Sequence, residues 1–200
     1  LHILHLDTGA MYRTVALYML RNGIDPQDEQ TVSARCGEAD VRVAYQDGAQ
    51  RTMLGGEDVS DLIRTGEVSA AASAISKWPT VRRRMVAAQR EIAATADMLI
   101  DGRDIGTRVL IDAPVKIFLT ATPEERARRR YRQQIEKGDM TPYEQVLAEL
   151  NARDAQDMNR ETDPLRQAED AVLVDSTNMT PEQVVDAIIA VVEDVYGKRA

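Results

Sequence analysis

This 200-residue sequence has a single cysteine, lacks long apolar runs and has no excess of positive charge. Each of these features excludes a class of protein or site. The single cysteine, Cys36, excludes an internal disulfide bond and a zinc site built from cysteines, and it fits a reducing compartment. No apolar run approaches the roughly 18–20 residues that cross a bilayer. The net charge of −8 disfavours binding to nucleic acid or to an anionic membrane. Two histidines, His2 and His5, have no cysteine or carboxylate at ligand spacing, so no metal site is expected.

Short apolar segments alternate with amphipathic helical patterns along most of the chain. The expected strands are Ile3–Leu6, Met98–Ile100, Val115–Leu119 and Ala171–Val174. The expected helices cover residues 10–21, 66–77 and 79–96, and two more begin after Thr122 and Thr180, where a hydroxyl precedes Pro and Glu. This alternation predicts an α/β fold of parallel strands with helices on both faces of the sheet.

Polar residues gather where these strands end. The strings concerned are Asp7-Thr8-Gly9, Asp101-Gly102-Arg103-Asp104 and Asp175-Ser176-Thr177. Because such folds place their ligand beyond the carboxyl ends of the strands, these residues are candidates for a binding site. Arg103 and Asp104 could equally form an internal ion pair that closes a turn. Arg13 lies near a helix N-terminus, which favours anions, or is simply an exposed helix arginine.

A hairpin pattern interrupts the α/β alternation. Residues 41–45 and 51–54 alternate between apolar and polar side chains, and Gln46-Asp47-Gly48 between them is typical turn sequence. The pattern predicts a small antiparallel unit inserted into the chain.

Arginine is concentrated in the helix that follows Thr122. The residues are Arg126, Arg128, Arg129, Arg130 and Arg132. Such a cluster in an acidic protein favours a site for a polyanion, because guanidinium groups match phosphate oxygens bidentately. A solvated basic helix is the open alternative.

Arg153, Asp157 and Arg160 share one helix face by their spacing. Two cations beside a carboxylate could hold phosphates while the carboxylate accepts from a ribose hydroxyl. A surface ladder of salt bridges is the open alternative. Asp154 lies off this face and is expected to face solvent.

In their order, these strings resemble the bacterial-type cytidylate kinases, a branch of the P-loop nucleoside monophosphate kinases. The matching stretches are Leu6–Arg13, Gly56–Ser60, Ile63–Thr65, Asp101–Thr107, Ala113–Leu119, Arg153–Arg160 and Asp175–Thr177. The resemblance runs from Leu1 to the final helix. It implies a three-layer α/β fold, with a parallel sheet flanked by helices, a small antiparallel insert and a helical lid. The core domain would comprise residues 1–33 and 64–200, with the lid at roughly 126–160 and the nucleotide-binding insert at 34–63.

The resemblance also implies the reaction, which is transfer of the terminal phosphoryl group of ATP, with Mg²⁺, to CMP or dCMP. The expected partners are these small nucleotides, without nucleic acid or membrane, and the expected form is a cytoplasmic monomer. Catalytic roles would fall on Arg103, Arg128, Arg153 and Arg160. Acceptor binding would fall on Thr8, Arg13, Ser73, Arg82, Asp101, Arg103, Asp104, Arg153 and Asp157. Donor phosphates would meet Arg128, Arg129, Arg132 and Arg160.

The sequence departs from the family pattern at its start. The phosphate-binding string G-x-x-x-x-G-K-S/T is absent. Because the chain opens at Leu1 in strand-like sequence without Met, we expect it to begin inside a longer protein, with the loop and most magnesium ligands upstream. Two alternatives stay open: a non-catalytic nucleotide-binding module that lacks the donor loop, and a related kinase for another small acceptor.

Overall fold

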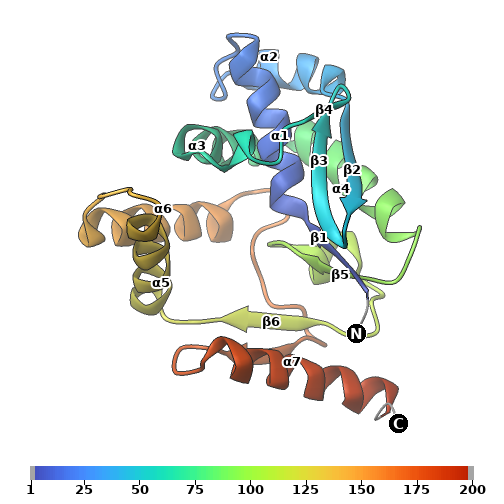
Figure 1. Ribbon diagram of the computed structural model, residues 1–200. Helices are drawn as coiled ribbons and strands as arrows, with labels where there is room; N and C mark the ends of the chain where they lie inside the picture. The colour runs from blue at the N-terminus through green and yellow to red at the C-terminus, as the bar shows by residue number, and fades with distance from the viewer. Residues whose placement is uncertain (1–2, 198–200) are drawn as a thin grey trace. The chain divides into compact units, whose positions relative to one another are not determined.

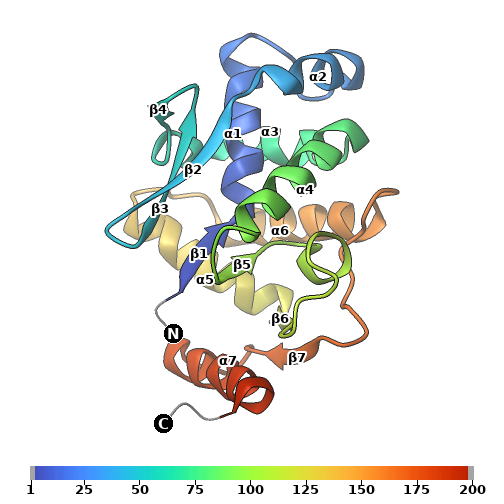
Figure 2. The same cartoon turned by 90° about the vertical axis from the view of Figure 1, so that its right-hand side faces the viewer.

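The computed structural model describes residues 3–197, so His2 lies outside the described part (Figures 1 and 2). The chain divides into two compact units. The first contains the residues up to Val109 together with Arg160–Asp163. The second contains Leu110–Asn159 and the chain from Pro164 onward.

The first unit carries most of the helices and strands. Its α-helices are α1 (Thr8–Arg21), α2 (Glu29–Arg35), α3 (Gly66–Ile75) and α4 (Pro79–Ala93). Its strands are β1 (Leu4–Asp7), β2 (Val41–Gln46), β3 (Ala49–Leu54), β4 (Glu57–Asp58) and β5 (Met98–Asp101). Short helical turns are η1 (Cys36–Glu38), η2 (Leu62–Arg64) and the π-helical η3 (Ile105–Val109).

Strand β1 pairs in parallel with β5, and the two lie side by side in Figure 2. The register places Asp7 opposite Asp101, so the two polar strand ends predicted from the sequence lie together. Helix α1 continues directly from the carboxyl end of β1. It begins at Thr8, two residues before the predicted start, because Asp7 caps it by accepting from the backbone N–H of Ala10.

The predicted antiparallel sheet is present as β2, β3 and β4. Asp47 and Gly48 form the turn between β2 and β3, with φ of 52° and 76°. Positive φ at both central residues is the two-residue hairpin geometry that Asp-Gly favours. The pairing register runs from Val41 opposite Leu54 to Gln46 opposite Ala49.

The core of the first unit surrounds α1. Met11, Val15 and Met19 are fully buried on this helix. They belong to one cluster with side chains of α3 and α4, such as Ile75 and Met85. Each such side chain contributes roughly 1.5–3 kcal/mol when fully buried. Helix α1 is therefore held rigidly at the strand ends that carry the candidate site.

The second unit contains its own parallel pair of strands. Its elements are β6 (Ile117–Thr120), α5 (Pro123–Glu136), α6 (Tyr143–Asn159), β7 (Val172–Asp175) and α7 (Pro181–Tyr196). Strands β6 and β7 pair in parallel, with Thr120 opposite Asp175. Thr122 and Thr180 cap α5 and α7 as their sequences predict, and Thr180 with Gln183 completes a capping box. The apolar stripe of α7 is only half-buried, and Val185 is exposed.

Candidate functional site

The site begins at the ends of β1 and β5. Asp7 accepts two hydrogen bonds through its carboxylate: from the backbone N–H of Ala10 at 3.0 Å, and from Nη2 of Arg13 at 2.6 Å. Thr8 is buried and donates its hydroxyl to the carbonyl of Asp101 at 2.7 Å. The Nε atom of Arg13 is buried without a hydrogen-bond partner, so this guanidinium keeps a donor in reserve for a ligand.

Gly102 allows the β5 strand end to pass close to α1. A Cβ atom at this position would lie 2.6 Å from Oγ1 of Thr8 and 2.7 Å from Cδ1 of Ile105. Real Cβ atoms do not approach other atoms so closely, so only glycine leaves both neighbours in place. The sequence Asp101-Gly102-Arg103-Asp104 therefore needs glycine for space.

We expect Gly102→Ala to lower the free energy of unfolding by about 1–3 kcal/mol, because the added methyl group must displace Thr8 or Ile105. Gly66→Ala is the matched control, since nothing lies within 4 Å of a Cβ atom at Gly66. That change should be neutral or mildly stabilising, by up to ~1 kcal/mol. Urea denaturation of both variants measures the difference in the free energy of unfolding. Equal stabilities would show that Thr8 and Ile105 can move aside without loss of stability.

Gln50 connects the antiparallel sheet to this strand end. Its Oε1 accepts from the backbone N–H of Asp7 at 2.7 Å, and its Nε2 donates to the carbonyl of Asp7 at 3.3 Å. A cavity of about 430 Å³ opens beside these groups. Its lining includes His5, Asp7, Gln50, Arg64 and Asp101. His5 and Asp101 contact each other in it, with 2.6 Å between Nε2 and Oδ2.

Among residues 3–197, the most buried charged side chain is that of Arg82, on α4. Only 1% of this residue is exposed. Its Nη2 donates to Oδ2 of Asp104, its Nε donates to Oδ2 of Asp163 at 3.2 Å, and its Nη1 donates to the carbonyl of Ser76 at 3.3 Å. Burial alone would lower the pKa of Arg82, but interactions with Tyr12, Asp104 and Asp163 raise it overall. The guanidinium therefore stays charged.

Asp104 is the buried acid of this network. Burial raises its pKa above the usual 3.8, while attraction by Arg82 and Arg160 acts in the opposite direction. The Nη2 of Arg160 lies 3.8 Å from Oδ1 of Asp104. Tyr12 borders the same group, and burial raises the pKa of its phenol to about 12. Asp104 thus pairs with Arg82 and lies near Arg160, and the alternative of an internal pair between Arg103 and Asp104 stays a prediction.

The structure locates the remaining predicted residues of the first unit as follows. Ser73 is half-buried on α3, and its carbonyl accepts from the hydroxyl of Ser76 at 2.8 Å. Arg103 is exposed directly after Gly102. Arg160, predicted as part of the lid, belongs to the first unit, where its side chain is 5% exposed. It therefore lies beside the predicted acceptor residues.

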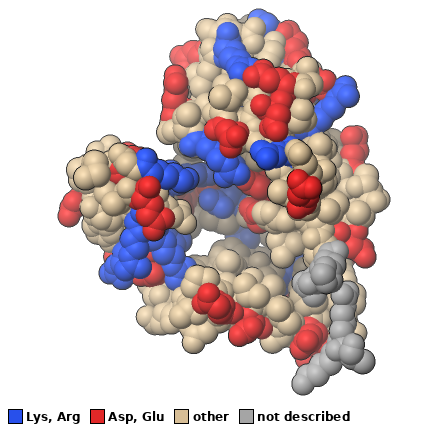
Figure 3. Space-filling view, in the orientation of Figure 1, with Lys and Arg blue, Asp and Glu red and all other residues tan. Residues whose placement is uncertain are grey.

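The arginines of α5 lie in the second unit, where Lys and Arg side chains gather over that helix (Figure 3). Arg128 and Arg129 pair with Glu125 at 2.8 and 3.0 Å. Arg126 pairs with Asp154 at 2.6 Å, while Arg132 is exposed. The expectation that Asp154 faces solvent is therefore wrong, because α6 packs on α5 and turns this carboxylate toward Arg126. Part of the arginine cluster is neutralised within the unit.

Arg153 and Asp157 lie on α6, also in the second unit. Arg153 is half-buried and Asp157 is buried. The predicted convergence of Arg13, Arg103 and Arg153 on one phosphate joins residues of both units, and it stays a prediction.

Sequence reasoning assigned no role to four residues that shape the site: Tyr12, Gln50, Arg108 and Asp163. Tyr12 lies inside a quoted motif, so its helical spacing could have placed it near Thr8. Gln50, Arg108 and Asp163 act through contacts with residues far away in the sequence, which no local sequence pattern predicts.

Comparison with known proteins bears on this arrangement. A family model described as cytidylate kinase matches residues 1–194. The chain belongs to the cytidylate kinase family. A cytidylate kinase of Mycobacterium avium is 51% identical over 183 residues, which cover 91% of this chain and 80% of the relative. One of Caldicellulosiruptor bescii is 47% identical over 186 residues, with 93% and 82% covered. One of Syntrophotalea carbinolica is 45% identical over 194 residues, with 97% and 83% covered.

Family membership confirms the class of fold and of protein predicted from the sequence: an α/β phosphotransferase. Nothing in the comparisons favours the non-catalytic alternative. Within residues 3–197, no helix combines the length and the apolar character needed to cross a membrane.

Proposed function

We propose that this cytidylate kinase family member transfers the terminal phosphoryl group of ATP to CMP or dCMP and reads the acceptor base with Arg82 and Asp104. The observation that supports this most is their buried ion pair, which joins the first turn of α4 to the loop after β5. A charged pair in such a place costs desolvation energy and is weak evidence for stability. A recognition role gives such a costly pair a function.

The chemistry of cytosine fits this pair. Its exocyclic amine donates a hydrogen bond, which a carboxylate such as Asp104 accepts. Its carbonyl and ring nitrogen accept hydrogen bonds, which Arg82 and the hydroxyl of Ser73 can donate. Uracil has a carbonyl where cytosine has the amine, and that carbonyl would face the carboxylate. The site would reject it because buried polar groups on both sides would lose their partners.

The acceptor phosphate would bind the arginines near the strand ends. Arg13 offers its unpartnered Nε, and Arg103 and Arg153 would complete the clamp. Thr8 and Asp101 would shape the floor through the hydrogen bond that joins them. Asp157 would hold the sugar by accepting from a hydroxyl.

Phosphoryl transfer then requires positioning and charge neutralisation more than a strong base. Arg128, Arg129, Arg132 and Arg160 would neutralise charge on the donor phosphates. Closure of a lid at residues 126–159 would exclude water, so that ATP is not simply hydrolysed. We propose that the protein acts in the cytoplasm as a monomer on small nucleotides.

Magnesium accompanies ATP in this type of reaction and would neutralise phosphate charge when bound. Within the described residues, however, no group of three or more His, Cys, Asp or Glu side chains could hold a metal ion.

A substrate panel tests the proposal. In the full-length protein, we expect turnover of CMP and dCMP with ATP, and much weaker turnover of UMP and AMP. Asp104→Asn should lower the preference for CMP over UMP by about 10- to 100-fold, because an amide can donate to the uracil carbonyl that a carboxylate repels. Equal turnover of UMP and CMP by the unmodified protein would refute the role given to Asp104.

A further inference from the structure

One acidic residue outside the recognised motifs contacts the centre of the acceptor site. Residues 160–163, here called the strap, connect α6 to the chain beyond Pro164 and belong to the first unit, although their neighbours on both sides belong to the second. Asp163 ends the strap with a φ of 49°, a left-handed conformation that is uncommon outside glycine. The structure therefore maintains an unfavourable backbone at this residue.

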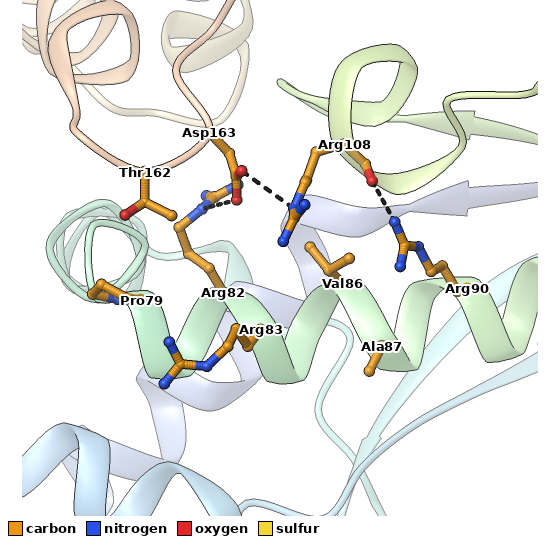
Figure 4. Close-up of a pocket in the computed structure, with 9 residues that line it drawn as sticks. All are labelled: Pro79, Arg82, Arg83, Val86, Ala87, Arg90, Arg108, Thr162 and Asp163. Atoms are coloured by element: carbon orange, nitrogen blue, oxygen red, sulfur yellow. Dashed lines mark hydrogen bonds and ion pairs between the residues drawn. The ribbon is translucent and has the colours of Figure 1, made fainter.

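Asp163 contacts three arginines. Its Oδ2 accepts from Nε of Arg82 at 3.2 Å, and its Oδ1 lies 3.2 Å from Nε of Arg108 (Figure 4). Its backbone carbonyl accepts from Nε of Arg160 at 2.6 Å. Both carboxylate oxygens are thus engaged by different guanidinium groups, which fixes the plane of the carboxylate.

The contact with Arg82 completes a three-sided hold on that guanidinium. Asp163 holds Nε, Ser76 holds Nη1 and Asp104 holds Nη2. Arginine has five N–H donors, and three are used in these contacts. A guanidinium plane fixed in this way can meet a ligand without first losing side-chain freedom, which is a cost of binding for a long side chain.

Arg108 has a different position in this arrangement. Its side chain is 51% exposed, and it approaches Asp163 from the side of a cavity of about 320 Å³. Figure 4 shows Arg108 and Arg82 reaching Asp163 from two different elements, η3 and α4. Asp163 is therefore contacted by the exposed Arg108 through one carboxylate oxygen and by the buried Arg82 through the other.

We propose that Asp163 is a positioning residue for acceptor recognition: held by Arg108, it fixes Arg82 in the orientation from which Arg82 and Asp104 read the base. This proposal rests on the function proposed above. Asp163 does not touch the acceptor. It acts only through Arg82, so its removal should weaken binding of the acceptor CMP and leave binding of the donor ATP unchanged.

The test is calorimetric titration of CMP and of ATP into the full-length protein and its Asp163→Asn variant. The amide keeps the shape of the side chain and removes its charge. We expect CMP to bind about tenfold more weakly, which corresponds to ~1.4 kcal/mol, with the dissociation constant for ATP unchanged. Asp170→Asn is the matched control, because the exposed Asp170 pairs with Lys116 of the second unit at 2.6 Å and the change should leave both dissociation constants unchanged.

A second variant separates positioning from general stability. Arg108→Gln removes the contact between Arg108 and Asp163 and should weaken CMP binding about threefold. The double variant with Asp163→Asn should bind CMP no more weakly than Asp163→Asn alone, because both changes act on the same contact. Arg108 is half-exposed, so this variant gives the same test if Asp163→Asn fails to fold. If either folded variant binds CMP with a dissociation constant within twofold of that of the unmodified protein, the positioning role is overturned. Failure of the unmodified protein to bind CMP would instead overturn the proposed function.

Discussion

Replacing Arg82 with Met should lower the free energy of unfolding by about 3–5 kcal/mol, the usual result of removing one partner from a buried ion pair. Methionine fills much of the space of the arginine stem, so the cavity left behind is small. The loss comes from Asp104, which stays buried without its main partner, and from Asp163 and the Ser76 carbonyl, which lose a donor each. Such a loss is a large part of the total stability of a domain.

The acid left behind makes the loss depend on pH. Burial already raises the pKa of Asp104, and removing Arg82 takes away an electrostatic attraction that lowers it. A carboxyl group with a raised pKa in the folded state favours folding at pH values below its unfolded pKa. That contribution is lost as the pH rises through the folded pKa. The deficit of Arg82→Met should therefore be smaller near pH 4 than near pH 7.

Arg83→Met is the matched control for this experiment. Arg83 is the next residue of α4 and is exposed, with a hydrogen bond to the hydroxyl of Thr80 at 3.1 Å. Changes at such positions usually stay within about 0.5 kcal/mol. Urea denaturation at the two pH values measures the free energy of unfolding of both variants. Equal losses at positions 82 and 83 would show that the contacts of Arg82 add no more stability than those of an exposed arginine.

Replacing Arg103 with Ala should reduce kcat/KM for CMP by about 10²- to 10³-fold, as expected when one charged donor to a reacting phosphate is removed. Arg103 directly follows Gly102 at the end of β5, beside the Asp7 and Thr8 end of β1. It is exposed in the structure, so its removal should cost little stability. The loss should therefore appear in kinetics and not in thermal unfolding.

Arg42→Ala controls for the loss of a surface arginine. Arg42 is on β2, its side chain is 73% exposed, and it pairs with Asp40 at 3.0 Å. Initial rates with CMP and ATP in the full-length protein should be unchanged by this substitution. A near-normal rate for Arg103→Ala, in a protein that turns over CMP, would remove Arg103 from the phosphate clamp.

Local signals in the sequence predicted most of the strands and helices, although α2 (Glu29–Arg35) was not among them. The Asp-Gly turn requires positive φ at both positions, and the structure has it at Asp47 and Gly48. The cap at Thr180 was readable because all of its partners lie within three residues. The parallel strand ends at Asp7 and Asp101 were placed together because fold rules bring successive strands of this type to the same edge.

The contacts of the site were less predictable, because they join residues far apart in the chain. Arg82 and Asp163 are 81 positions apart, and no periodic pattern links them. Asp154 was expected to face solvent because spacing within one helix does not reveal a neighbouring helix, and that neighbour supplies Arg126. Conversely, Arg82 and Asp104 were assigned to one function by resemblance, and the structure adds that they contact each other.

The amide of Gln50 has a consequence for how the molecule meets copies of itself. In an extended strand, the N–H and C=O of one residue point to the same side, and both groups of Asp7 point to Gln50. The side chain thus imitates a peptide group of an adjoining strand. At Asp7, both backbone groups on that side are already engaged by Gln50, so a foreign strand cannot pair with β1 at this residue.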